Sequence, residues 1–259
     1  MILNIHGSLG DHIMATGLPE AYFKLTGEYT YIKTERAGGD PVYWENNPYV
    51  SKQLVGELRS LAFNAYPKDH MIYTPVRMFY DISGHIMDRS QVHPNLYKAL
   101  QPDGDLIVVN DQAGWPSRRG YPYLDELIHS LLGDGWQVCY MRNDEFADCF
   151  GSRSARQLTG CTFEVQPTLR QGVEVLQRAS VYIGYDSGYA QVAGALGVPY
   201  VLLAGPIPPV NTAHNSCIYA LDIPGCRRCC TTSCENGCLQ NAPNRNGEIR
   251  DAILRNTKR

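Results

Sequence analysis

Residues 181–199 read VYIGYDSGYAQVAGALGVP and decide the fold. An apolar strand comes first, a glycine-containing turn follows, and a run of small and apolar residues at 187–196 is typical of a buried helix. Gly197 supplies a stop signal for this helix, and a new apolar run begins at position 199. A strand, a tight turn and a helix in this order predict a unit of an α/β fold.

The turn within this stretch has the features of an anion site. In a parallel sheet, the free amides of Ser187, Gly188 and Tyr189 lie at the carboxyl edge, where the helix dipole favours negative charge. Gly188 lets a ligand approach the backbone closely, and the Ser187 hydroxyl adds a donor. A phosphate or pyrophosphate fits such a turn, and the alternative is that Asp186 or Ser187 only caps the helix.

The residues on either side continue the alternation of strands and helices. This alternation predicts a parallel sheet that helices cover on both faces. The strands are expected at 106–110, 136–141, 180–184 and 199–203, and the helices at about 121–133, 168–178 and 187–196.

The first hundred residues contain a similar but less regular pattern. A strand is followed by a glycine-containing turn and by a helix from Asp11 onward, which Pro19 is expected to weaken or kink. The strands are expected at 2–5, 29–33 and 71–74, and residues 75–100 are expected to be irregular with short helices.

A length of 259 residues suits two small lobes. The polar turn cluster at 101–105 separates the irregular region from the regular one. We therefore expect an N-terminal lobe of residues 1–104 and a C-terminal lobe of residues 105–259.

The turn at 7–11, Gly-Ser-Leu-Gly-Asp, places an acidic residue after the first strand. It lacks the third glycine of the dinucleotide-binding fingerprint, so this turn alone does not identify a ligand. Asp11 is either a general base toward a ligand hydroxyl, since it follows the carboxyl end of a strand, or the N-cap of the helix.

The composition excludes several classes of protein. With 44% hydrophobic and 19% charged residues the chain is a folded globular protein, and a net charge of -3 is unlike that of proteins that bind nucleic acid through the phosphate backbone. The sequence shows neither a secretory signal pattern nor 18 consecutive apolar residues. We expect a cytoplasmic protein without stable membrane insertion.

The two turns together resemble the heptosyltransferase family of bacterial glycosyltransferases. The matching features are the Gly-Asp turn at 10–11 that opens a helix, the segment Glu-Asn-Asn-Pro-Tyr at 45–49, and Gly-x-Asp-Ser-Gly at 184–188 followed by Gly-Val-Pro and Gly-Pro. The resemblance implies a GT-B architecture, in which two Rossmann-like lobes face a cleft. The acceptor would bind the first lobe and the nucleotide-sugar the second.

The resemblance also implies roles for individual residues. Asp11 corresponds to the catalytic base of the family, and the donor-binding residues would be Arg118, Arg119, Asp186, Ser187 and Gly188. Asp186 would contact the donor sugar, Ser187 and Gly188 the diphosphate, and Arg118 or Arg119 would neutralise the diphosphate as it leaves. The sequence contains Asp-x-Asp only at 103–105, in the polar turn cluster that precedes an expected strand, so the leaving-group charge is expected to be met by protein groups and no catalytic metal is expected.

The implied reaction is inverting transfer of a sugar from a nucleotide-diphosphate sugar to a hydroxyl acceptor. The sugar would be a heptose from ADP-heptose and the acceptor a saccharide of a lipopolysaccharide or capsule. Two alternatives stay open: the acceptor is a protein or a modified nucleic-acid base, as for phage-type transferases, or the chain is a non-catalytic nucleotide-sugar-binding protein.

Five of the nine cysteines lie within residues 226–238. Cys226, Cys229, Cys234 and Cys238 form two closely spaced pairs that resemble a tetrathiolate metal knuckle, and Cys230 is an alternative to Cys229. A structural zinc ion suits four thiolates, with iron as the alternative metal and with free thiols or disulfides as the non-metal alternatives. Some relatives, including those that modify autotransporter proteins, also carry a cysteine cluster near this position.

Overall fold

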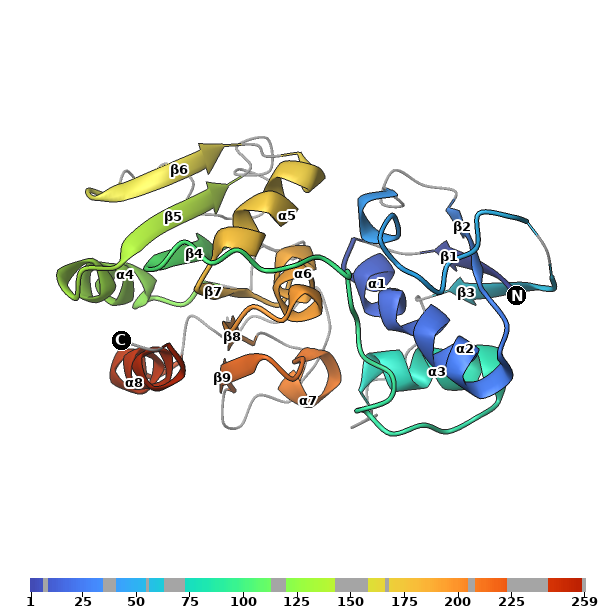
Figure 1. The fold of residues 1–259 in the computed structure, drawn as a ribbon. Coiled ribbons are helices and arrows are strands. Elements are labelled where there is room, and N and C mark those ends of the chain that lie inside the picture. Colours follow the sequence, from blue (N-terminus) through green and yellow to red (C-terminus); the bar gives the residue numbers. More distant parts are fainter. Residues whose placement is uncertain are drawn as a thin grey trace.

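The computed structural model describes residues 1–6, 9–34, 41–54, 56–62, 73–112, 120–142, 158–165, 168–204, 208–222 and 242–257. Within them the chain forms two separate parallel β-sheets (Figure 1). The strands of the first sheet all precede residue 104, and those of the second all follow it. The division into lobes at that residue stays a prediction.

The first sheet consists of β1 (Ile2–His6), β2 (Tyr31–Thr34) and β3 (Leu58–Ala62) in the order β2-β1-β3. Its helices are α1 (Leu9–Met14), α2 (Leu18–Thr26) and α3 (Thr74–Ser83), with a 3-10 turn, η1 (Ala15–Gly17), between the first two and another, η2 (Pro41–Tyr43), after β2. Pro19 lies in the first turn of α2, so the expected single helix is divided into two, because proline is tolerated there but not in a helix interior.

The second sheet has the strand order β6-β5-β4-β7-β8-β9, and every neighbouring pair is parallel. Its strands are β4 (Leu106–Asn110), β5 (Gln137–Arg142), β6 (Cys161–Val165), β7 (Val181–Tyr185), β8 (Tyr200–Leu203) and β9 (Cys217–Leu221). All residues of β4 and β7 are buried, as expected for central strands that helices cover on both faces.

Helices cover both faces of the second sheet (Figure 1). On the face turned to the first lobe lie α5 (Leu169–Arg178) and α6 (Gly188–Leu196), and the opposite face carries α4 (Leu124–Gly133) and α8 (Asn246–Asn256). A short helix, α7 (Pro209–Thr212), precedes β9. Alternate residues of β4 divide between the two layers, since Leu106 and Val108 join one hydrophobic cluster and Ile107 and Val109 the other.

One hydrophobic core runs through both lobes. The cluster beneath α5 and α6 continues into the core of the first sheet, which includes Leu3, Ile5 and Ile13. The chain between α3 and β4 also follows the second lobe, where the Leu96 amide donates to the Ala195 carbonyl over 3.1 Å. The two sheets are therefore held together by apolar packing as well as by the chain that connects them.

Several expectations from the sequence need correction. The third strand of the first sheet is β3 and not residues 71–74, since Thr74 begins α3; residues 71 and 72 lie outside the described residues. The strands β6 and β9 and the helix α8 were not predicted, and none of them has a turn motif as clear as that of residues 184–188. Among the described residues, no helix is long and apolar enough to cross a membrane.

Candidate functional site

The helices that follow the two predicted turns, α1 and α6, lie side by side (Figure 1). Leu9 is the first residue of α1, and Gly188 is the first residue of α6. A Cβ atom added to Gly188 would come within 2.5 Å of Leu9 Cδ2 and 2.7 Å of Leu9 Cγ. Glycine at this position therefore allows the first lobe to pack directly on the donor-side turn. The fold thus brings the turns of Asp11 and Asp186 to one junction between the lobes.

Asp186 follows β7 directly and is 9% exposed. Its Oδ1 accepts a hydrogen bond from Gln191 Nε2 over 3.3 Å. Ser187 is the N-cap residue of α6, with the extended backbone angles φ -148° and ψ 172°, but its side chain makes no capping hydrogen bond. Ser187 therefore occupies the N-cap position, as one of the two interpretations expected, but its hydroxyl does not satisfy the first amides of α6.

Asp11 is the third residue of α1 and is partly exposed, so it does not occupy the N-cap position. A carboxylate in the first turn of a helix interacts favourably with the helix dipole. The next residue, His12, is completely buried, and burial lowers its pKa even though the Asp11 carboxylate acts in the opposite direction. Burial thus favours the neutral imidazole of His12, next to the Asp11 carboxylate.

The segment Glu45-Asn46-Asn47-Pro48-Tyr49 is hydrogen-bonded to the turn that follows α1. Asn47 is buried, its side-chain amide donates to the Thr16 carbonyl over 3.1 Å, and its Oδ1 accepts from the Tyr49 amide over 3.0 Å. The Thr16 hydroxyl donates to the carbonyl of Ile13 over 2.7 Å. This segment thus fixes the turn after α1, and through it the helix that carries Asp11.

Glu45, at the start of that segment, joins the two lobes through its ion pair with Arg170, and it also pairs with Lys98 of its own lobe. Its carboxylate contacts Lys98 Nζ at 2.5 Å and the Arg170 guanidinium of α5 at 3.0 and 3.2 Å. These two cations lower the pKa of Glu45 to about 2. The resemblance pointed to this segment without assigning a role to Glu45.

A second contact between the lobes was also missed by sequence reasoning. Tyr73, which precedes α3, contacts His214 of the second lobe, and His214 in turn contacts Gln191, the hydrogen-bond partner of Asp186. The sequence contains no signal for this group, because its members lie far apart along the chain and each type is common in ordinary cores.

Two sets of predicted residues lie outside the described residues: Arg118 and Arg119, and the cysteines Cys226, Cys229, Cys230, Cys234 and Cys238. Within the described part of the chain, no three His, Cys, Asp or Glu side chains are grouped closely enough to hold a metal ion. The described cysteines Cys139, Cys161 and Cys217 are free thiols.

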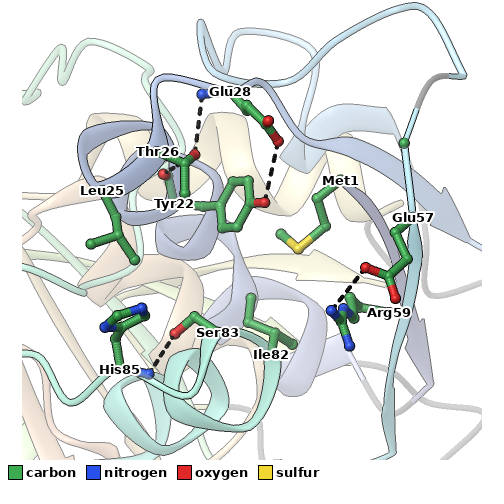
Figure 2. A pocket seen from close by; sticks show the side chains of 11 residues that line it. Met1, Tyr22, Leu25, Thr26, Glu28, Glu57, Arg59, Ile82, Ser83 and His85 are labelled. Carbon is green, nitrogen blue, oxygen red and sulfur yellow. Dashed lines mark hydrogen bonds and ion pairs between the residues drawn. The ribbon is translucent and has the colours of Figure 1, made fainter.

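A pocket of about 270 Å³ opens on the first lobe (Figure 2). Met1, Glu57 and Arg59 contribute to its lining, together with the ends of α2 and α3. It therefore lies at the amino ends of β1 and β3, whereas ligands of open α/β sheets bind at the carboxyl ends of strands. We assign this pocket no part in the chemistry of the Asp11 and Asp186 turns.

Comparison with known proteins agrees with this geometry. The sequence model of glycosyltransferase family 9 (heptosyltransferase) matches residues 88–239. A search of curated proteins found no match.

Several solved structures are similar in fold, including three heptosyltransferases. The ADP-heptose lipopolysaccharide heptosyltransferase II of E. coli is 16% identical, with a TM-score of 0.63 and coverage of 98% of each chain. E. coli heptosyltransferase WaaC with ADP is 15% identical, with a TM-score of 0.61 and coverage of 99% of this chain and 98% of that one. The dodecameric iron-containing heptosyltransferase TibC of enterotoxigenic E. coli, in complex with ADP-D-β-D-heptose, is 15% identical, with a TM-score of 0.64 and coverage of 99% of this chain and 77% of that one. The fold is thus the GT-B fold of these enzymes.

Proposed function

Because the chain belongs to glycosyltransferase family 9, the heptosyltransferase family, we propose that it transfers a heptose from ADP-heptose to a hydroxyl acceptor with inversion at the anomeric carbon. The observation that carries this proposal is the junction of α1 and α6, where Leu9 packs on Gly188. A base on one lobe and a donor site on the other must meet if one cleft is to hold both substrates.

The donor side of the proposed site is the start of α6. Its first amides would bind the diphosphate, since the Ser187 side chain does not cap them and the helix dipole favours an anion. Asp186 would accept hydrogen bonds from the sugar hydroxyls, and Arg118 or Arg119 would meet the charge that develops on the leaving diphosphate. The donor is supported by two similar structures, TibC with ADP-D-β-D-heptose and WaaC with ADP.

The acceptor side is the start of α1. Asp11 would take the proton of the acceptor hydroxyl as that oxygen attacks the anomeric carbon from the face opposite the diphosphate. Such a direct displacement inverts the configuration and needs no covalent intermediate. We propose a saccharide of a lipopolysaccharide or capsule as the acceptor, with a protein as the second candidate; a net charge of -3 disfavours a nucleic-acid base.

We also propose that Cys226, Cys229, Cys234 and Cys238 hold a structural metal ion. Four thiolates form a closed tetrahedral ligand set that suits zinc or iron and leaves no open position for catalysis. The similar structure of TibC is described as iron-containing, which makes iron a serious alternative to zinc.

The proposed function is tested with ADP-heptose and heptose-deficient lipopolysaccharide as donor and acceptor. We expect wild-type protein to transfer heptose, and Asp11→Asn to lose transfer by at least about 100-fold, the usual contribution of a general base. Titration with ADP should give the same affinity for both proteins, since Asp11 is placed on the acceptor side. Unchanged turnover of Asp11→Asn would contradict its role, and a wild-type protein that binds ADP-heptose without transferring it to any acceptor would favour the non-catalytic alternative.

A further inference from the structure

We propose that Tyr73, His214 and Gln191 form a relay of positioning residues that orients Asp186 toward the donor sugar and makes this orientation depend on the contact between the lobes. The inference rests on the proposed function, in which Asp186 contacts the sugar. It adds three residues that touch neither substrate and act through Asp186.

The relay is a continuous chain of hydrogen bonds. The Tyr73 hydroxyl lies 2.6 Å from His214 Nδ1, and His214 Nε2 lies 2.5 Å from Gln191 Oε1. Gln191 Nε2 then reaches Asp186 Oδ1 over 3.3 Å. Tyr73, His214, Gln191 and Asp186 are all buried, so each bond is protected from competition with water.

The carboxylate of Asp186, at the end of the relay, determines which atom donates in each hydrogen bond. An ionised Asp186 only accepts, so the Gln191 amide nitrogen must donate to it and leave Gln191 Oε1 as an acceptor. His214 therefore carries its proton on Nε2 and accepts on Nδ1 from the Tyr73 hydroxyl. This arrangement requires a neutral imidazole, and burial lowers the pKa of His214 to about 3, with Arg89 nearby acting in the same direction.

Packing holds the imidazole in place. A Cβ atom at Gly194 would lie 1.9 Å from His214 Cδ2, so the ring sits directly on the helix backbone, three residues beyond Gln191 and on the same face. The His214 backbone amide donates to the Tyr200 hydroxyl over 2.6 Å. The Tyr73 bond at Nδ1 and the Gln191 bond at Nε2 are thus made by one rigid imidazole, so a change at one nitrogen affects the bond at the other.

The first link of the relay comes from the other lobe. Tyr73 precedes α3 of the first lobe, whereas Gln191 and His214 belong to the second. The Arg89 guanidinium lies 4.3 Å from the centre of the Tyr73 ring and donates to the carbonyl of Ala213, next to His214. If the lobes move apart, the Tyr73 bond is lost and His214 no longer has a donor at Nδ1. The sugar contact is then weakest when the site is open.

The experiment compares wild-type protein, Tyr73→Phe and Gln191→Met by calorimetric titration with ADP-heptose and with ADP. Tyr73→Phe removes one hydroxyl and keeps the ring against Arg89. We expect it to weaken ADP-heptose binding about three- to tenfold, the effect of one hydrogen bond, and Gln191→Met to weaken it more. ADP binding should not change, because ADP lacks the heptose that Asp186 is proposed to contact. The control is Tyr219→Phe, which removes an exposed hydroxyl bond, 2.9 Å long, to Glu248 of α8, a helix on the opposite face of the second sheet from α6.

The Asp186→Ala background separates positioning from general damage. If the relay acts through Asp186, Tyr73→Phe should have no further effect on ADP-heptose affinity in this background. The same loss with and without Asp186, or equal losses for ADP and ADP-heptose, would overturn the proposal.

A measurement without ligand distinguishes failure of the relay from failure of the proposed function. The changes in melting temperature caused by Tyr73→Phe and Asp186→Ala should not be additive, and they should become additive in a Gln191→Met background, where the chain is broken. If wild-type protein does not bind ADP-heptose, the proposed function is wrong. The relay is then tested by the melting temperatures alone. Additive effects of Tyr73→Phe and Asp186→Ala in the protein with an intact Gln191 would reject it.

Discussion

Gly188 at the start of α6 lies directly against Leu9 at the start of α1, so closely that a Cβ atom at position 188 would come within 2.5 Å of Leu9 Cδ2. The two residues belong to different lobes. Leu9 begins α1, which contains Asp11, and Gly188 begins α6, which follows Asp186. This contact joins the acceptor-side and donor-side turns, and its geometry leads to the first prediction.

Gly188→Ala should destabilise the protein by about 1–3 kcal/mol, because the added methyl group overlaps Leu9. Leu9→Ala should restore part of that stability in the double variant, since it removes the atoms that clash. Urea unfolding of the wild type, both single variants and the double variant measures the effect. As a control, Gly247→Ala in α8 adds a methyl group where no atom lies within 4 Å, and it should not destabilise. Additive effects of the two substitutions at the junction would mean that the lobes do not meet at these residues.

Glu45→Gln should weaken the attachment of the lobes. It removes the charge that pairs with Lys98 and Arg170, a loss of about 1 kcal/mol for a partly exposed group at low salt. The folded state lowers the pKa of Glu45 to about 2 from 4.5, so its stabilising effect is present above pH 4.5 and is lost as the pH falls toward 2. The difference in melting temperature between wild type and variant should therefore shrink between pH 6 and pH 3.

Glu57→Gln is the matched control for Glu45, because Glu57 forms an exposed ion pair with Arg59 within the first lobe at 2.9 Å. Its melting temperature should stay close to that of wild type at both pH values. A loss in Glu57→Gln as large as that in Glu45→Gln would show that the contact between lobes has no special part in stability.

Acid should destabilise the protein through His214. The pKa of His214 is about 3 in the folded state and about 6.5 in the unfolded chain, so between these values only the unfolded state binds the proton. Stability then falls as the pH drops below 6.5, by about 2 kcal/mol from this residue between pH 7 and pH 5. Buried His12 contributes with the same sign, since its pKa is also lowered.

Urea unfolding at pH 7 and pH 5 measures this dependence. His214→Gln should be less stable than wild type at pH 7 but should lose less stability on acidification. The exposed residue His129 provides a control in His129→Gln, which should keep the full pH dependence of wild type. An unchanged pH dependence in His214→Gln would mean that His214 is not buried in its neutral form.

The cysteine cluster should carry one metal ion per chain. Elemental analysis of protein purified without added metal should find zinc or iron at about one equivalent, and a variant with Cys226 and Cys229 replaced by Ser should lose it. Removal of the metal should lower the melting temperature, because a closed tetrathiolate site contributes to folding. Protein that holds no metal and has the same melting temperature with a chelator would reject the site.

The sequence predicted most of the second lobe. Central strands such as β4 are continuous apolar runs, because helices cover both of their faces, and Gly197 ends α6 with a φ of 78° as its position suggested. The first lobe was harder to predict. β3 has exposed residues at its start, since it lies at the edge of a three-stranded sheet, and its sequence gives little apolar signal.

Some residues of the candidate site could be predicted from the sequence, and others could not. Asp11 and Asp186 stand beside glycine-containing turns, and local backbone chemistry makes such turns readable from the sequence alone. Tyr73, His214 and Gln191 carry no local signal, and the segment that contains Glu45 gives no sign of its role, because their contacts join residues that are distant in the chain.

The sequence by itself thus determined the α/β class, the two turns and the family resemblance, since periodicity and turn residues act over a few neighbouring positions. Only the tertiary structure decided that the two turns meet through Leu9 and Gly188, and that Asp186 is linked to Tyr73 of the other lobe. The physical reason is that apolar packing between the lobes and the pairing of buried polar groups are properties of the folded chain. Different combinations of residues can make such contacts, so no pattern of neighbouring residues predicts them.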